Sequence, residues 1–386
     1  EIIMKKVLSL VLVLAMVLMF SAVASADAIP ADQIKVGLIL LHDENIGYDE
    51  IHLNGFMDMV KALGLTEEQY SIKYNVPETE VCYDKAIELV DEGCDIIFAD
   101  SFGHESYLLQ AAAEHPEVQF CHATGYQAKG SGLSNMHNYF TSIYEARYVS
   151  GVVAGLKLNE MIEQGKITAE QAVMGYVGAY PYAEVISGYT AFYLGARSVC
   201  PSVTMKVTYT NSWADMALEK EAADALIAQG CVLISQHADT TGAPTACQAA
   251  GVPCVGYNVS MISVAPDSAL TSAAVVWGPY YTYAVKCLID GEEIATDWCK
   301  GYVDGAVEIK ELNEKTVAAG TEETVNAVIE KLKNGELHVF DTSTFTVDGK
   351  VLEDETYVWD GYYHESELAS APSFTYIVDG ITVPEA

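Results

Sequence analysis

The sequence has few positive charges for its length. It holds 20 Lys and Arg residues against 54 Asp and Glu residues, which gives a formal net charge of −34 over 386 residues. A surface this acidic repels phosphate backbones and anionic lipid head groups. We therefore expect no nucleic-acid partner, while a closed pocket for a small neutral or cationic ligand is compatible with the charge.

The usual signatures of catalysis and metal binding are also missing. The chain has no GxSxG, GxxxxGK[ST] or HExxH motif, and no GxGxxG motif follows the first apolar run. The nine cysteines form no CxxC pair, and most lie in apolar patterns, which favours buried thiols over a disulfide framework. His237 and Asp239 end the apolar run that starts at Cys231, but no second histidine is near enough to complete a metal face. We expect no enzyme, no metal and no cofactor.

Only one long apolar run is present, and it lies at the N-terminus. Lys5 and Lys6 precede the run Val7–Phe20, and Ala-Ser-Ala follows at 24–26. This order is typical of an export signal cleaved after residue 26. The run is short for a membrane span, although a retained anchor is the alternative. We expect an exported protein in the periplasm or on the outer face of the cytoplasmic membrane, with a signal peptide at 1–26.

Strand and helix patterns alternate along the rest of the chain. Apolar strands are predicted at 34–42, 94–100, 118–125, 172–180, 231–239 and 252–261, and amphipathic helices at 48–64, 79–93, 106–116 and 143–165. Repeated β-α units of this size predict parallel sheets with helices on both faces. The fold class is therefore α/β.

The two halves of the chain echo each other. The stretch ELVDEGCDIIFADSFG aligns with ALIAQGCVLISQHADT, each a helix, a Gly-Cys pair, an apolar strand and a polar loop. We expect an N-terminal lobe of 27–140 plus 274–310, a C-terminal lobe of 141–273, and a C-terminal segment of 311–386 that packs on the lobes. Two such lobes bring their strand ends to a shared cleft, where ligands of open α/β sheets bind.

Aromatic and hydrogen-bonding residues gather where the predicted strands end. Flat aromatic faces beside polar groups suit a planar heterocycle or a sugar ring. Ordinary core packing is the alternative for each aromatic residue, and Asp239 could instead cap the next helix. The candidate ligand-binding residues are Asp43, Tyr48, Ser101, Phe102, Tyr180, Trp213, His237, Asp239, Asn258 and Trp277.

Four long segments of the chain carry a resemblance to a known family: IIFADSFGHESYLLQAAAEHPEVQFCHATGY, NYFTSIYEARYVSGVVAG, SWADMALEKEAADALIAQGCVLISQHADT and SALTSAAVVWGPYY. They resemble the basic membrane protein family, the substrate-binding proteins of ABC importers that are related to purine nucleoside receptors. The resemblance implies a type I periplasmic-binding-protein fold with three hinge crossings and a purine held between two closing lobes. The implied partners are a small-molecule purine and an ABC permease in the membrane, and we expect a monomer.

The resemblance also suggests which purine is bound. Nucleoside receptors of the family carry an Asp-x-x-Phe-Asn loop after the first strand, which places Asp43 at its Asp and Tyr48 near its stacking aromatic. The Asp and Lys taken to serve the ribose fall at Asn258 and near Val275, and the bulky Trp277 follows. The loss of this clamp favours a free base such as adenine. A nucleoside, another small ligand of the same fold, a sensing receptor without transport, and a nucleoside-processing enzyme are the alternatives.

Overall fold

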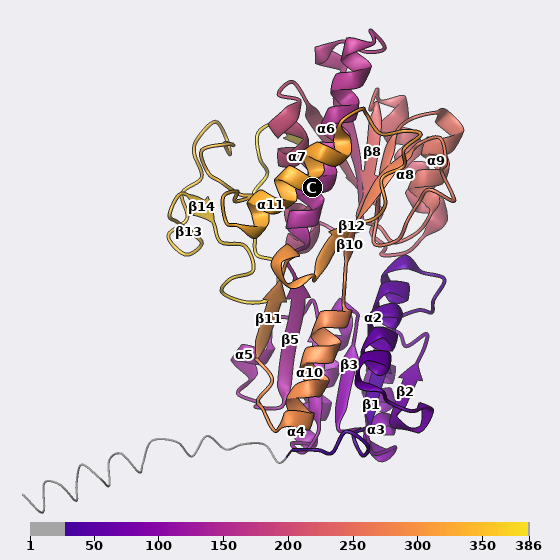
Figure 1. Cartoon of the computed structure of the whole chain (residues 1–386), viewed down its shortest axis with the longest axis vertical. Helices are drawn as coiled ribbons and strands as arrows, with labels where there is room; N and C mark the ends of the chain where they lie inside the picture. The colour runs from indigo at the N-terminus through magenta and orange to yellow at the C-terminus, as the bar shows by residue number, and fades with distance from the viewer. Residues whose placement is uncertain (1–27, 385–386) are drawn as a thin grey trace, which may run out of the picture.

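The protein consists of two α/β lobes stacked along its long axis. The computed structural model describes residues 28–384, so the expected signal peptide at 1–26 lies outside the described residues. In Figure 1 the first lobe, drawn mainly in indigo and purple, lies below the second lobe, drawn mainly in magenta and salmon. Each lobe has a mostly parallel sheet with helices packed against it, which confirms the fold class predicted from the sequence.

The first lobe is built on a six-stranded parallel sheet with the order β11-β5-β4-β3-β1-β2. All four residues of β1 and of β3 are buried, because helices cover both faces of the sheet. Its strands are β1 (Val36–Ile39), β2 (Tyr70–Lys73), β3 (Ile96–Ala99), β4 (Gln119–Ala123), β5 (Met136–Thr141) and β11 (Asp297–Lys300). Its helices are α2 (Gly47–Leu63), α3 (Glu80–Asp91), α4 (Glu105–Glu114), α5 (Ala128–Ser131) and α10 (Gly278–Asp290).

The second lobe has a seven-stranded sheet with the order β12-β10-β9-β8-β6-β7-β15, in which only β12 is antiparallel to its neighbour. Its strands are β6 (Val173–Gly178), β7 (Thr204–Tyr209), β8 (Leu233–Gln236), β9 (Cys254–Tyr257), β10 (Ala269–Val275), β12 (Val307–Ile309) and β15 (Ile381–Thr382). Its helices are α6 (Ile143–Glu163), α7 (Ala183–Val199), α8 (Met216–Ala228) and α9 (Gly242–Ala250).

The chain passes between the lobes three times, from β5 to α6, from β10 to α10 and from β11 to β12. The range 274–310, expected in the first lobe, is therefore divided. Helix α10 packs on α2 and β11 joins the first sheet, but β12 returns to pair with β10 in the second sheet. The free edge of β10 explains the return, because β12 satisfies backbone groups that would otherwise lack partners.

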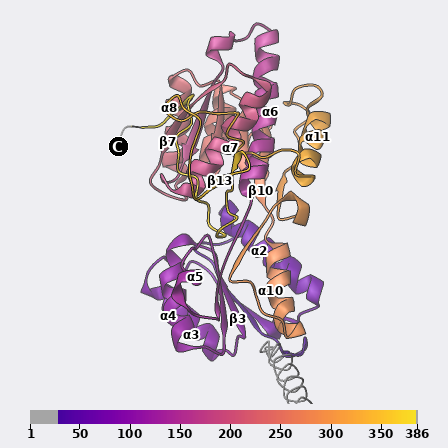
Figure 2. The same ribbon diagram turned by 90° about the vertical axis from the view of Figure 1, so that its left-hand side faces the viewer.

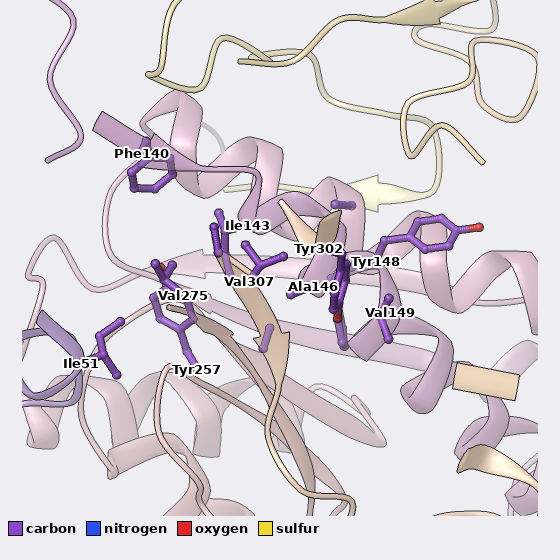
Figure 3. Close-up of a cluster of buried hydrophobic side chains, with 14 of the residues drawn as sticks. Ile51, Phe140, Ile143, Ala146, Tyr148, Val149, Tyr257, Val275, Tyr302 and Val307 are labelled. Carbon is purple, nitrogen blue, oxygen red and sulfur yellow. The ribbon is translucent and has the colours of Figure 1, made fainter. Parts of the chain in front are cut away.

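Apolar side chains fill the junction beside the crossings. Figure 3 shows Ile143 and Ala146 of α6 close to Val275 and Val307, which come from the ends of two crossing strands. All four side chains are at most 2% exposed. The hinge therefore has a packed apolar core, which keeps the three crossings together.

Helices α6 and α7 lie in close contact in the second lobe. A side chain on Gly151 would overlap the backbone of Phe192, and one on Gly195 would overlap the backbone of Tyr148. Glycine is required at these positions because only its missing Cβ lets the two backbones approach so closely.

The C-terminal segment packs mainly on the second lobe. Helix α11 (Thr321–Lys333) contacts α6, and β15 pairs with β7 at the edge of the sheet. Residues 337–340, which follow α11, are irregular, and Phe340 stacks on Phe374 with 4.6 Å between ring centroids. Strands β13 (Val358–Trp359) and β14 (Tyr362–Tyr363) form a small hairpin.

All nine cysteines lie in the described part of the chain and are unpaired, and eight of them are buried. From residue 28 to residue 384, no helix combines the length and the apolar character needed to cross a bilayer.

Candidate functional site

A small cavity lies between the two lobes. The first lobe contributes Leu41, His42, Tyr48, Asp49, Ser101, Phe102 and Thr124, and the second lobe contributes Glu184, Trp213, His237, Asp239 and Tyr257. These residues end or follow β1, β3, β4, β6, β7, β8 and β9, or begin the next helix. The cavity therefore lies at the carboxyl ends of both parallel sheets, the usual ligand position in open α/β folds.

Tyr48 is an aromatic wall of fixed orientation. Its hydroxyl donates a hydrogen bond to the Asp100 carbonyl oxygen, with 2.9 Å between the oxygens. Behind its ring, His52 makes an edge contact at 4.7 Å between centroids, and Trp277 stacks on His52 at 4.4 Å. The layered support leaves a face of Tyr48 available to a flat ligand.

The second lobe supplies two further aromatic walls. The ring of Trp213 makes an edge contact with Tyr180 at 5.1 Å between centroids. The Arg147 guanidinium lies over the ring of Tyr257, 3.8 Å from its centroid, and Arg147 Nη1 donates to the Gln236 carbonyl oxygen at 2.7 Å. Arg147 therefore fixes the position of Tyr257 through a cation–π contact.

Several buried polar atoms of the cavity wall lack protein partners. Thr124 Oγ1, Asp239 Oδ1 and Tyr257 OH make no hydrogen bond to any described residue. A buried polar atom without a partner costs ~1–3 kcal/mol. A ligand whose polar edge meets these atoms would remove that cost, so the arrangement favours binding of a polar, flat molecule.

The first-lobe side of the cavity is acidic. Asp49 accepts hydrogen bonds from the His42 backbone nitrogen at 2.6 Å and lies 3.1 Å from His42 Nδ1, which raises the pKa of His42. Burial, together with the nearby Asp49, holds the pKa of Asp100 well above its ordinary value. The carboxyl groups of Asp49 and Asp100 therefore lie close together on this side of the cavity.

The second-lobe side is acidic as well. His237 Nε2 lies 3.1 Å from Glu184 Oε1, and burial followed by the charge of Arg147 lowers the pKa of His237. A neutral His237 donates its Nε2 proton to the Glu184 carboxylate. Burial, with Glu219 as the next contribution, raises the pKa of Asp239 well above its ordinary value. The cavity thus presents carboxyl groups from both lobes to a ligand.

The structure brings six of the ten candidate residues to the cavity wall, namely Tyr48, Ser101, Phe102, Trp213, His237 and Asp239. Ser101 and Phe102 follow β3, while His237 and Asp239 follow β8. The two loops that echo each other in the sequence therefore face each other across the cleft.

The other four candidates lie outside the wall. Asp43 accepts hydrogen bonds from the backbone and side-chain nitrogens of Asn45 within its own turn. Tyr180 lies behind Trp213, in stacking contact with Tyr182 at 5.0 Å between centroids. Asn258 has a positive φ of 61°, and its Oδ1 accepts from the Val275 backbone nitrogen at 3.4 Å. Asn258 therefore shapes the strand end behind the cavity.

Trp277 differs most from expectation. It is 1% exposed and stacks on His52, so it supports Tyr48 from the second layer and does not fill a ribose position at the wall. Helix α2 covers Trp277, because Gly55 lets that helix approach: a Cβ on Gly55 would lie 2.7 Å from the Trp277 Cβ.

Sequence reasoning did not place several wall residues among the ten candidates: Leu41, His42, Asp49, Thr124, Glu184 and Tyr257. Asp49 and Glu184 lie in the first turns of α2 and α7, where acidic residues are common for electrostatic reasons alone. The signal that would have found them is their position directly after strands that end at the cleft.

A family model for PnrA-like ABC transporter substrate-binding proteins, named Bmp, matches residues 47–343. The chain belongs to the Bmp family. A purine-binding protein of Brucella abortus is 32% identical over 350 residues, which cover 86% of this chain and 92% of that protein. A Haloferax volcanii protein named for glucose binding in an ABC transporter is 34% identical over 251 residues, 65% of this chain and 60% of that protein.

Solved structures of other solute-binding proteins share the fold of this Bmp family member. One from Aeropyrum pernix has a TM-score of 0.65 at 15% identity and covers 83% of this chain and 94% of its own. One from Conexibacter woesei has a TM-score of 0.62 at 19% identity and covers 79% of this chain and 98% of its own. The described residues contain no group of three or more His, Cys, Asp or Glu side chains arranged to hold a metal ion. The chain is an ABC transporter substrate-binding protein.

Proposed function

We propose that this Bmp family member captures a free purine base with an exocyclic amino group, such as adenine, between its lobes outside the cytoplasm and delivers it to an ABC permease. The single observation that carries the proposal is a cleft cavity with aromatic walls from both lobes and unpartnered polar atoms between them. The aromatic faces take the plane of the base, and the polar atoms take its edge.

Aromatic side chains from both lobes support a flat ligand between them. Tyr48 and Trp213, one from each lobe, offer rings to the two faces of a flat molecule. Contact with both lobes would bias the hinge toward the closed form, because the ligand binds that form more tightly.

The polar groups favour a ligand rich in hydrogen-bond donors. Asp49, Glu184 and Asp239 line the cavity, and Asp239 Oδ1 accepts no hydrogen bond from any residue that the structure describes. An exocyclic amino group and a ring N–H satisfy such acceptors. The purine-binding relative from Brucella abortus also supports a purine ligand.

A sugar is the second candidate, because of the Haloferax volcanii relative. Aromatic faces and carboxylates suit a pyranose ring as well as a base.

A thermal-shift screen of residues 27–386 with adenine, guanine, hypoxanthine, adenosine, inosine and glucose separates the candidates. A ligand at 100 times its dissociation constant stabilises the protein by ~2.7 kcal/mol. We expect the largest shift with adenine. A shift with glucose and with no purine would overturn the proposal.

The Asp239→Ala variant tests the polar edge. Loss of a hydrogen bond to a ligand in a closed cleft costs ~1–3 kcal/mol, so we expect adenine affinity to fall roughly tenfold or more. Asp84→Ala is the matched control, because Asp84 is exposed on α3 and outside the cavity. Equal adenine affinities in the two variants would remove Asp239 from the site.

A further inference from the structure

A second hollow adjoins the cavity on its outer side. The two spaces share Phe102, Thr124 and Glu184 as wall residues, so they lie side by side. We call this outer hollow, which Tyr126, Tyr182 and the C-terminal segment complete, the vestibule.

Exposed aromatic rings line the vestibule. Phe102 is 38% exposed, Tyr126 58% and Tyr182 42%, although large aromatic side chains usually bury most of their surface. Phe102 stacks on Tyr126 with 6.3 Å between centroids, and it meets Tyr182 from the other lobe at 5.5 Å. Such a cluster of exposed apolar rings beside a cavity is typical of a binding surface.

The outer wall of the vestibule comes from the C-terminal segment. We call residues 364–373 the strap; its Ala371 and Pro372 line the vestibule. Ser370 fixes it to the first lobe, because its backbone nitrogen and its Oγ both donate to Asp297 Oδ1 of β11, at 3.0 and 2.9 Å. Figure 2 shows the yellow C-terminal chain descending from the second lobe to the boundary with the first.

The start of the strap is held on the second lobe, because the Tyr144 hydroxyl of α6 donates to the Glu365 carbonyl oxygen at 3.4 Å. Within the C-terminal segment, Glu365 Oε2 accepts hydrogen bonds from Ser373 and from the Phe374 backbone nitrogen, and Phe374 stacks on Phe340. The strap therefore bridges the two lobes beside the cleft. It also lies beyond residue 343, where the match to the Bmp family model ends, so this wall is a feature of the present chain outside the matched region.

We propose that the vestibule is an outer subsite for a flat, apolar substituent carried by the bound purine, with the strap as its outer wall. This inference rests on the proposed function, because the base must occupy the inner cavity. An aromatic substituent would cover the exposed faces of Tyr182 and Tyr126, and the gain from such ring contacts is independent of hydrogen bonding. The ligand class then includes substituted purines as well as the free base.

Calorimetric titration with adenine, 6-benzylaminopurine and 9-benzyladenine tests the subsite. The two benzyl compounds carry the same ring on opposite sides of the base, so the test does not depend on how the base is oriented. We expect at least one of them to bind as tightly as adenine or more tightly. Tyr182→Ala should lower the affinity for that compound about fivefold and change the affinity for adenine less than twofold.

Tyr74→Ala is the matched control, because Tyr74 is 41% exposed and lies outside both hollows; it should change neither affinity. Asp297→Ala removes the carboxylate that binds Ser370. It should lower the affinity for the benzyl compound and leave the affinity for adenine unchanged. Tight binding of adenine with tenfold weaker binding of both benzyl compounds would overturn the subsite and keep the proposed function. An equal loss of affinity for adenine and for the benzyl compound in Tyr182→Ala would do the same. No binding of any purine would overturn both.

Discussion

The buried carboxyl group of Glu219 should make the free energy of unfolding depend on pH. Glu219 lies in the first turn of α8 with no exposed surface, and both its oxygens accept from the Thr240 backbone nitrogen, at 3.2 and 3.1 Å. Burial raises its pKa from 4.5 to about 7. The bond to Thr240 holds the loop that carries Asp239, so this group supports the binding site.

The sign of the effect follows from the raised pKa. The folded protein holds the Glu219 proton more tightly than the unfolded chain, so the stabilisation is fully present below the unfolded pKa and is lost as pH rises through 7. At ~1.4 kcal/mol for each unit of pKa difference, this group alone lowers the free energy of unfolding by about 3 kcal/mol between pH 4.5 and pH 8. Glu219→Gln cannot titrate and should lack this part of the pH dependence.

Urea unfolding of the ligand-free protein at pH 5 and pH 8 measures the effect. The wild type should lose about 2–3 kcal/mol of unfolding free energy between pH 5 and pH 8 because of this group. Glu219→Gln should lack this loss. Glu221→Gln is the matched control, because Glu221 is exposed on the same helix, and it should follow the wild type. Parallel pH profiles for the wild type and Glu219→Gln would refute the reasoning.

Two further substitutions test the packing behind the site. Gly151→Ala should lower the free energy of unfolding by about 3 kcal/mol, because the added Cβ overlaps the backbone of α7; Gly130→Ala, with no atom near the added Cβ, should have little effect in the same thermal or urea assay. Trp277→Lys should destabilise the protein by about 3 kcal/mol or more, because it buries an unpaired charge, and should create no nucleoside binding in calorimetry. If the folded Trp277→Lys protein bound inosine, residue 277 would lie beside the ribose of a bound nucleoside after all.

The order of the elements could be predicted because apolar runs of strand length alternate with helical patterns. The loops after β3 and β8 could be predicted as well, since a buried parallel strand followed by polar residues must end at one edge of its sheet. Ser101, Phe102, His237 and Asp239 were found in this way, and all four line the cavity.

The remaining wall residues depend on tertiary packing that a local pattern does not contain. Asp43 and Asp49 lie in one short acidic stretch. In the fold, Asp43 bonds to Asn45 within its own turn, while Asp49 lines the cleft, and the sequence does not distinguish these two positions. Trp277 is hidden by an approach that Gly55 permits from a distant part of the sequence. The placement of β12 likewise depends on the free edge of β10, a strand more distant in the sequence that β12 pairs with in the fold.

Isothermal titration of adenine into residues 27–386, after unfolding and refolding to remove any bound ligand, tests the central claim most directly. We predict saturable binding at one site per chain, weakened roughly tenfold or more in Asp239→Ala. Absence of heat with adenine, guanine and hypoxanthine, together with saturable binding of glucose, would contradict the assignment of a purine to the cleft.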